Sequence, residues 1–388
     1  MRIWVTAGGL LAITLATTGA ADARDPLPAW ASWTASPVAI DESSLDPLER
    51  EALAHCGMGE AGLRDVARAL VARKMAGEPL PDLDGIAQAQ RAAGEPHPWP
   101  RAWAAHAASL GVAPPMAKFD AWIGAPSSMR RCGVASGRGD DGSRSLVVVV
   151  VDALADLSPL PACARTGQWV TVEAHLRVPA VAASVIVLDT GGATRTVPSW
   201  REGSTIRARF APEGPGELAL QVVADVSGGP RPVLEATVFV DVDPPADAEP
   251  KAAPGEGAPE GPDEQRLGRM LDGARASVGL PPLPRDSRLD EIARAHARRM
   301  AASHELAHDV GDGDPFERLR AAGLDAHQAG ENVAHASSLA LAHRAVWASP
   351  SHRMNLLGRA FDRVGIGVAR DERGEAWVVE TFAGALRP

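Results

Sequence analysis

Hydrophobic and polar residues alternate over residues 160–243, and a period of two is typical of β-strands. The strand-like runs are residues 169–176, 185–188, 206–210, 218–223 and 233–242, with glycine- and proline-rich turns between them. Short strands at this spacing predict an all-β, immunoglobulin-like sandwich over residues 156–243. No residue in it indicates chemistry, so we interpret it as a spacer or docking module.

The region over residues 30–155 starts with a helical pattern. Asp46-Pro47 predicts a helix start with proline at the first helical position, and Gly77 with Pro79 ends the helical run. Two strand-like runs, residues 131–135 and 146–151, close the region. We predict a mostly helical domain here.

The last region, residues 263–388, combines helical stripes with one hairpin. Helix starts are predicted near Asp263, Ser287 and Asp314, and strands over residues 364–369 and 376–382. Before it, residues 244–262 are proline, glycine, alanine and acids without apolar periodicity. Such a composition predicts a semi-extended linker.

Residues 1–23 have the layout of a secretory signal peptide. Arg2 precedes an apolar run over residues 3–15, and small residues lead to Ala23, after which we expect cleavage. An uncut membrane anchor is the alternative. No later run approaches the ~20 apolar residues of a membrane span. We therefore expect a secreted or periplasmic protein without an integral membrane segment after processing.

Charge and cysteine content bear on the possible partners of the protein and on its disulfides. The 388 residues carry a net charge of −10 with scattered lysines and arginines, which argues against nucleic acid as a partner. Of the three cysteines, Cys56 and Cys132 both fall in the first folded region, and we favour a disulfide between them. Buried free thiols are the alternative.

Four sequence blocks in the last region carry a family signature. Met300 precedes His308 by eight residues, and Gly330-Glu331-Asn332 follows. The third block spans residues 347–355, and the fourth spans residues 363–382. In this order, residues 263–384 resemble the CAP superfamily in its bacterial, SCP-like extracellular form. The resemblance implies an α-β-α sandwich.

The resemblance also implies a cleft that gathers two histidines and an acid. Carried over by motif, these are His308, Glu331 and His352, a plausible set of ligands for Zn²⁺ or another divalent cation. Asn332, Arg353 and Asn355 occupy supporting positions that hold the loops. Eukaryotic members carry a second Glu where this chain has Ser349-Pro350, so we expect weaker metal affinity. A polar cluster that only pins loops together is the alternative. The remaining histidines of the region are expected to be surface or helix residues, namely His296, His327, His335 and His343.

The first region ends in a way that parallels the last. Residues 121–128 correspond to residues 346–352, with Ser128 where His352 stands and no Gly-Glu-Asn equivalent. We interpret residues 30–155 as a degenerate CAP-like copy. An unrelated helical domain is the alternative.

A second motif overlaps the first histidine. His304-Glu305-Leu306-Ala307-His308 spells H-E-x-x-H, which on a helix would bind zinc, with Glu305 as general base. Gly311 and Gly313 follow at once, at the end of a long helix, which weighs against a zincin-type peptidase.

Three function classes follow. We favour a non-catalytic binding module whose cleft takes a divalent metal, a small apolar molecule, an envelope component or a protein partner. The first alternative is a hydrolase that uses the His308/Glu331/His352 cluster or the zincin motif. Because no Ser or Cys paired with a base is evident, it would act through metal-activated water. A structural envelope protein is the second alternative.

Overall fold

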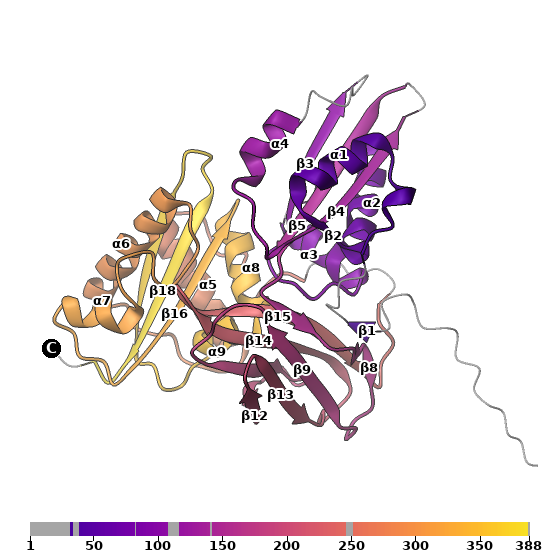
Figure 1. The fold of residues 1–388 in the computed structure, drawn as a ribbon. Coiled ribbons are helices and arrows are strands. Elements are labelled where there is room, and N and C mark those ends of the chain that lie inside the picture. The colour runs from indigo at the N-terminus through magenta and orange to yellow at the C-terminus, as the bar shows by residue number, and fades with distance from the viewer. Residues whose placement is uncertain are drawn as a thin grey trace, which may run out of the picture.

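Three parts, each built around sheets, follow one another along the chain (Figure 1). The structure is a computed structural model and describes residues 32–33, 39–81, 83–107, 116–139, 142–245 and 251–386. The predicted signal peptide, residues 1–23, lies outside the described residues. Within them, no helix has the length and apolar character needed to span a membrane.

The first part packs helices against a sheet of strand order β2-β4-β5-β3. Its elements are α1 (Pro47–Cys56), β2 (Met58–Gly59), α2 (Ala61–Met75), α3 (Leu83–Ala92), β3 (Arg101–Ala107), α4 (Met116–Ile123), β4 (Arg130–Arg138) and β5 (Arg144–Asp152). The sequence predicted the β4–β5 hairpin but missed β3. Four of the seven residues of β3 are alanines with weak strand propensity, so its pairing with the valine-rich β5 decides its conformation.

Local capping fixes two of the predicted helix starts. The Asp46 side chain accepts from Glu49 N at 2.8 Å, and Glu49 accepts from Asp46 N at 3.2 Å. Asp314 and Glu317 repeat this capping box at α7, again with proline at the first helical position. Cys56, at the end of α1, forms a disulfide with Cys132 on β4.

The middle part is a pair of facing sheets. Its strands are β6 (Ala155–Leu157), β8 (Cys163–Ala164), β9 (Val170–Leu176), β10 (Ala183–Leu188), β11 (Thr194–Val197), β12 (Ser199–Glu202), β13 (Thr205–Phe210), β14 (Gly216–Val226) and β15 (Gly229–Val240). One sheet has the order β11-β10-β14-β15-β8 and the other β12-β13-β9-β6, while β1 (Ser32–Trp33) pairs with β7 (Leu160–Pro161). The predicted period of two holds on β9, where Val170, Val172 and Ala174 enter the shared core.

The last part places helices on both faces of a sheet of order β16-β18-β17. Its elements are α5 (Asp263–Ser277), α6 (Ser287–Ser303), α7 (Pro315–Ala321), β16 (Gln328–Ala336), α8 (Leu339–Ala348), α9 (Pro350–Leu356), β17 (Arg363–Arg370) and β18 (Ala376–Gly384). On β18, Trp377 and Val379 pack against α6, whereas Ala376 and Val378 pack on the α5 and α8 side. The strand therefore contributes to two cores.

Part of the predicted linker belongs to this last part. Ala253 is buried, and Pro254 O accepts from His343 Nε2 of α8 at 2.9 Å. A Cβ added to Gly255 would lie 2.4 Å from Met270 O of α5. Of the predicted linker, residues 253–256 are thus packed rather than extended, because glycine and proline here allow close contact with α5 and α8.

The first and last parts share one order of elements. Three helices, an edge strand and a hairpin follow in this order in both. Before the hairpin, the first part has α4 and the last part has α8 and α9. The sheet orders β3-β5-β4 and β16-β18-β17 match. In both parts, the segment before the second helix pairs in parallel with the first strand of the hairpin. In the first part β2 pairs with β4, and in the last part a bridge joins Arg285 to Val364 of β17.

Glycines on equivalent strands let that second helix approach the sheet closely. A Cβ on Gly133 would lie 2.0 Å from the Leu63 carbonyl carbon of α2, and one on Gly365 would lie 2.2 Å from that of Leu289 on α6. Any side chain at these positions would force helix and sheet apart.

Gly133→Ala and Gly365→Ala should therefore each lower the free energy of unfolding by about 3 kcal/mol, measured by urea denaturation. Gly257→Ala is the control, since nothing lies within 4 Å of its added Cβ, and it should change stability by less than about 0.5 kcal/mol. Equal stability of Gly365→Ala and the control would contradict the close-packing argument.

Candidate functional site

His308 lies between α6 and α7, and its backbone is held from two sides. Its N–H donates to Gly228 O in the β14–β15 turn at 2.9 Å, and its carbonyl accepts from Arg318 Nη1 at 2.7 Å. Only 15% of its side chain is exposed. The sandwich and α7 together fix the place of this imidazole.

Glu331 lies on β16 with both carboxylate oxygens engaged. Oε1 accepts from His308 Nδ1 at 2.9 Å, and Oε2 accepts from Arg318 Nη2. Burial raises the pKa of this carboxyl, but the hydrogen bond from His308 and the charge of Arg318 outweigh burial and hold the pKa below its ordinary value. Glu331 is therefore an ionised, fully paired acid.

His296 extends this network inside the protein. Its Nδ1 lies 2.9 Å from Asp312 Oδ2, its Nε2 lies 3.0 Å from Ala307 O, and the ring also approaches Glu331 Oε1 at 3.9 Å. His296 and His343 lie on helices as expected, but both are buried rather than at the surface. Helical spacing alone did not show which neighbours would cover them.

His352 lies on α9, whose position is set by two asparagines. Asn332 Nδ2 donates to His352 O at 3.2 Å, and Asn355 Nδ2 donates to Asn332 Oδ1 at 3.0 Å, which joins α9 to β16. His352 Nδ1 is 2.7 Å from Ser349 Oγ. Burial first, and the charge of His308 second, lower the pKa of His352 to about 4.

Two further residues support the site. The Arg353 guanidinium lies 3.8 Å from the Trp347 ring centroid, and its Nε donates to Trp347 O, which fastens α9 to the end of α8. Glu380 on β18 accepts from Asn332 Nδ2 at 3.0 Å, while burial raises the pKa of Glu380 to about 7. The sequence analysis missed Glu380, although an acid inside an otherwise apolar strand was a usable signal.

The cluster does not fit the metal that the resemblance implies. Within the described residues, two groups bring three His or carboxylate ligand atoms within 4.8 Å of one another, and His308, Glu331 and His352 are not among them. The Arg318 guanidinium bound to Glu331 would also repel a divalent cation. His308 and Glu331 meet directly, while His352 pairs with Ser349 instead.

The H-E-x-x-H motif also lacks the geometry of a zinc protease. α6 ends at Ser303, and His304 caps it in the left-handed conformation, with φ of 54°. Glu305 and His308 then follow outside the helix. The two histidines therefore do not lie one helical turn apart, and the zincin hypothesis finds no support.

Ser349 and His352 form a serine–histidine pair that the sequence analysis did not identify. In a hydrolase the histidine would need a third group to orient it and enough basicity to take the hydroxyl proton. Here the Ser349 hydroxyl accepts from Gln221 Nε2 at 2.9 Å, and the low pKa of His352 makes it a weak base. We interpret the pair as a helix-start contact.

The sandwich contacts the cluster at two points. Gln221 of β14 binds Ser349 and also accepts from Ser351 N at 2.9 Å, while the β14–β15 turn receives the His308 N–H. A Cβ on Gly229 would lie 2.9 Å from His308 Cβ. The middle part is thus in direct contact with the cluster, beyond the spacer role that the sequence suggested.

Surface hollows lie elsewhere in the last part. One of about 340 Å³ is lined by Leu280, Phe361 and the proline-rich loop after α5, together with Arg275 and Arg359. A second of about 220 Å³ lies between α5 and β17. Neither is lined by a residue of the His308–Glu331–His352 cluster.

Comparison with known proteins finds a family match in the last part. Residues 269–382 match the family model of the cysteine-rich secretory protein family, CAP. Over 116 residues the chain is 30% identical to YkwD of Bacillus subtilis, covering 29% of this chain and 44% of YkwD. The chain thus spans less than half the length of this relative.

Solved structures with the same kind of domain resemble the chain more distantly. An extracellular SCP-domain protein of Bacillus anthracis is 16% identical over 60% of this chain and 86% of its own, with a TM-score of 0.29. A cysteine-rich secretory protein of Staphylococcus aureus is 14% identical over 59% and 83%, with a TM-score of 0.27.

Replacing Arg318 by Met should be severely destabilising, because the buried Glu331 carboxylate would lose the guanidinium that balances its charge. We expect a loss of about 3–5 kcal/mol in the free energy of unfolding. Arg288→Met, which removes an exposed partner of Asp286, should change stability far less, because solvent screens that pair. Adding Glu331→Gln to Arg318→Met should restore part of the loss; no restoration would contradict the pairing argument.

Acid should destabilise the protein partly through His352. The folded-state pKa of about 4 lies below the unfolded value of 6.5, so the unfolded chain takes up a proton first as the pH falls. The stability that His352 contributes is complete above pH 6.5 and is lost as the pH falls towards 4. Between pH 7 and pH 4.5, the free energy of unfolding measured by urea denaturation should fall by about 2 kcal/mol less in His352→Gln than in the parent. The exposed His304→Gln should behave like the parent, and identical falls in all three proteins would refute the assignment.

Proposed function

We propose, from the premise that the C-terminal region is a bacterial CAP domain, that this protein is a secreted or periplasmic binding module without catalytic activity. The matching family model is that of cysteine-rich secretory proteins, which supports export. Within the described residues no helix suits a membrane span. The signal peptide, with cleavage after Ala23, remains our prediction.

The pairing of Glu331 is the observation on which the proposal rests. A general base must have a free lone pair near the substrate or water that it activates. Both oxygens of Glu331 instead accept from His308 and Arg318. Its lowered pKa further weakens it as a base. The acid is better suited to holding the cluster together than to catalysis.

The character of the exposed groups favours a polar ligand. His308, Ser349, Ser351 and His352 are each partly exposed. Glu331 and Ser349 occupy the Nδ1 atoms of the two histidines, so their Nε2 atoms are the hydrogen-bonding groups offered to a ligand. Burying them against a small apolar molecule would leave these groups unpaired. Of the expected partners, a polar envelope component such as a cell-wall glycan or peptide therefore fits best, with the sandwich forming part of the binding surface.

We further propose that residues 30–155 are a degenerate copy of the CAP domain, followed by an immunoglobulin-like sandwich over residues 156–243. Strand register supports this. Glu331 pairs with Thr381, which pairs with Gly365, and in the first part Ala102 pairs with Val149, which pairs with Gly133.

The first copy therefore has Ala102 where the last part has Glu331. An alanine at this position cannot form the paired acid, so we assign the first part a structural role.

Binding to purified, insoluble cell walls tests the function. We expect the full mature chain to co-sediment with them, and His308→Ala/His352→Ala to bind about tenfold more weakly or less. His304→Ala should bind as the parent does. Failure of the parent to bind, or equal binding by the double variant, would favour the structural-protein alternative.

Catalysis is tested in parallel by casein and cell-wall hydrolysis with and without chelator. We expect no activity above background. Chelator-sensitive hydrolysis that is lost in Glu305→Gln or Glu331→Gln would overturn the proposal in favour of a metal-dependent hydrolase.

A further inference from the structure

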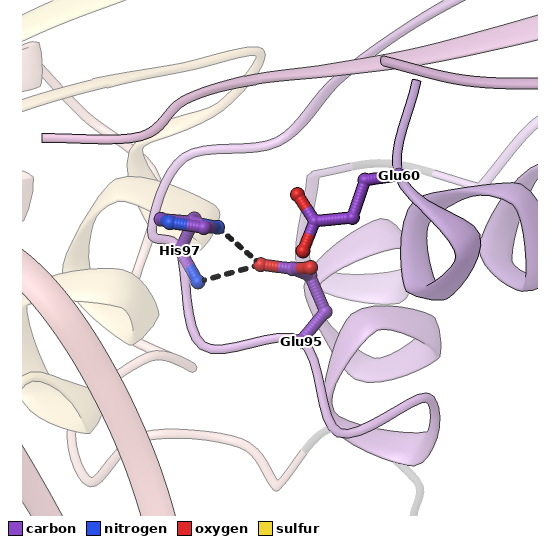
Figure 2. Close-up of side chains that lie close together, drawn as sticks. All are labelled: Glu60, Glu95 and His97. Atoms are coloured by element: carbon purple, nitrogen blue, oxygen red, sulfur yellow. Dashed lines mark hydrogen bonds and ion pairs between the residues drawn. The ribbon is translucent and has the colours of Figure 1, made fainter. Parts of the chain in front are cut away.

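Two acids and a histidine meet inside the first part, away from the CAP domain (Figure 2). Glu60 precedes α2, whereas Glu95 and His97 lie in the loop between α3 and β3. All three are buried, with 3%, 4% and 2% of their surfaces exposed. Their ligand atoms lie within 4.8 Å of one another.

One oxygen of this group has no partner. Glu60 Oε2 is buried without a hydrogen-bond partner in the described part of the chain, although its side chain points toward Glu95 (Figure 2). An orphaned, buried carboxylate oxygen is costly. A cation bound between Glu60 and Glu95 would satisfy it.

The histidine is oriented as a metal ligand would be. His97 Nε2 lies 3.1 Å from Ala155 O, so this nitrogen carries the proton that it donates to the carbonyl. The other nitrogen, Nδ1, pairs with Glu95 Oε1. Burial lowers the pKa of His97, but the charge and hydrogen bond of Glu95 outweigh burial and raise it, so a metal ion would replace the Nδ1 proton. A backbone carbonyl that fixes the far nitrogen is the usual support of a metal-bound histidine.

Charge balance points the same way. Burial, and next the charge of Glu95, raise the pKa of Glu60 to about 8, so without an ion Glu60 keeps a proton near neutral pH, and a cation would take the place of that proton. The charge of the buried Arg131 guanidinium lowers the pKa of Glu60 less than burial raises it, and Arg131 Nη1 donates to Ser128 O and Arg130 O rather than to either acid.

We propose that Glu60, Glu95 and His97 Nδ1 bind a divalent transition-metal ion, with zinc as the expected occupant. Two carboxylates and one imidazole are suitable ligands for zinc, whose bonds of about 2.0–2.2 Å would require only small movements of these side chains. The fourth position would be taken by water.

The other three-residue group, His335 with Asp371 and Glu375, is a weaker candidate. Asp371 Oδ2 accepts from Trp377 Nε1 at 3.2 Å, and its Oδ1 accepts from backbone amides of the β17–β18 turn. These bonds account for the acid as part of the hairpin. No comparable bond accounts for Glu60 Oε2.

The site would join the first part to the sandwich. His97 contacts Ala155 of β6, and in the same loop Pro96 O accepts from Glu235 N of β15 at 2.8 Å. Arg231 of β15 also lies 4.5 Å from the Trp99 ring centroid. An ion held by His97 would therefore stabilise this loop and, through it, the junction.

Zinc titration of the chelator-treated full chain tests the site by calorimetry and metal analysis. We expect one zinc ion per chain, and affinity reduced at least about 100-fold in Glu60→Gln and His97→Gln. His308→Ala/His352→Ala and the surface variant His55→Gln should bind as the parent does. The double variant separates this site from the CAP cluster.

Hydrogen exchange of the parent gives a readout that does not depend on the variants folding. Zinc should slow exchange of amides in residues 94–97 and near Ala155, with no comparable change around His308. The proposal would be overturned if the parent did not bind zinc stoichiometrically, or if folded Glu60→Gln and His97→Gln bound zinc as tightly as the parent. Loss of zinc binding in His308→Ala/His352→Ala, or zinc-dependent amide protection only in other parts of the chain, would also overturn it.

Discussion

A buried ion pair between Arg318 and Glu331 organises the C-terminal domain. Both side chains are almost fully covered, so each charge has lost its hydration and depends on the other. Arg318 also binds the carbonyl of His308, which places that loop against the sandwich. The same pair occupies Oε2 of Glu331, and our proposal of a non-catalytic role depends on it.

The sandwich contributes to the site as well as separating the two flanking parts. Gln221 is fully buried at its contact with Ser349 and also donates to Glu235 Oε1 at 2.6 Å. Glu235 in turn donates its N–H to the loop that carries His97. Strands β14 and β15 therefore contact both the first and the last part. These contacts connect the cluster in the last part to the junction between the sandwich and the first part.

Local patterns predicted much of the fold. Alternation identified the main strands of the sandwich, and Asp-Pro pairs located two helix starts, because both signals depend on neighbours within a few residues. The alanine-rich β3 was missed because its conformation depends on pairing with β5. The packed segment around Gly255 was interpreted as a linker for a related reason: its composition resembles a free chain until α5 and α8 provide a surface.

Sequence alone determined the family resemblance of the last region and the identity of its motif residues, since these are carried by short blocks in a fixed order. Only the tertiary structure decided which polar atoms meet. It paired Glu331 with Arg318, buried His296, and brought Glu60 to Glu95 and His97 across more than thirty residues. Such contacts depend on how distant segments pack, and no local pattern encodes them.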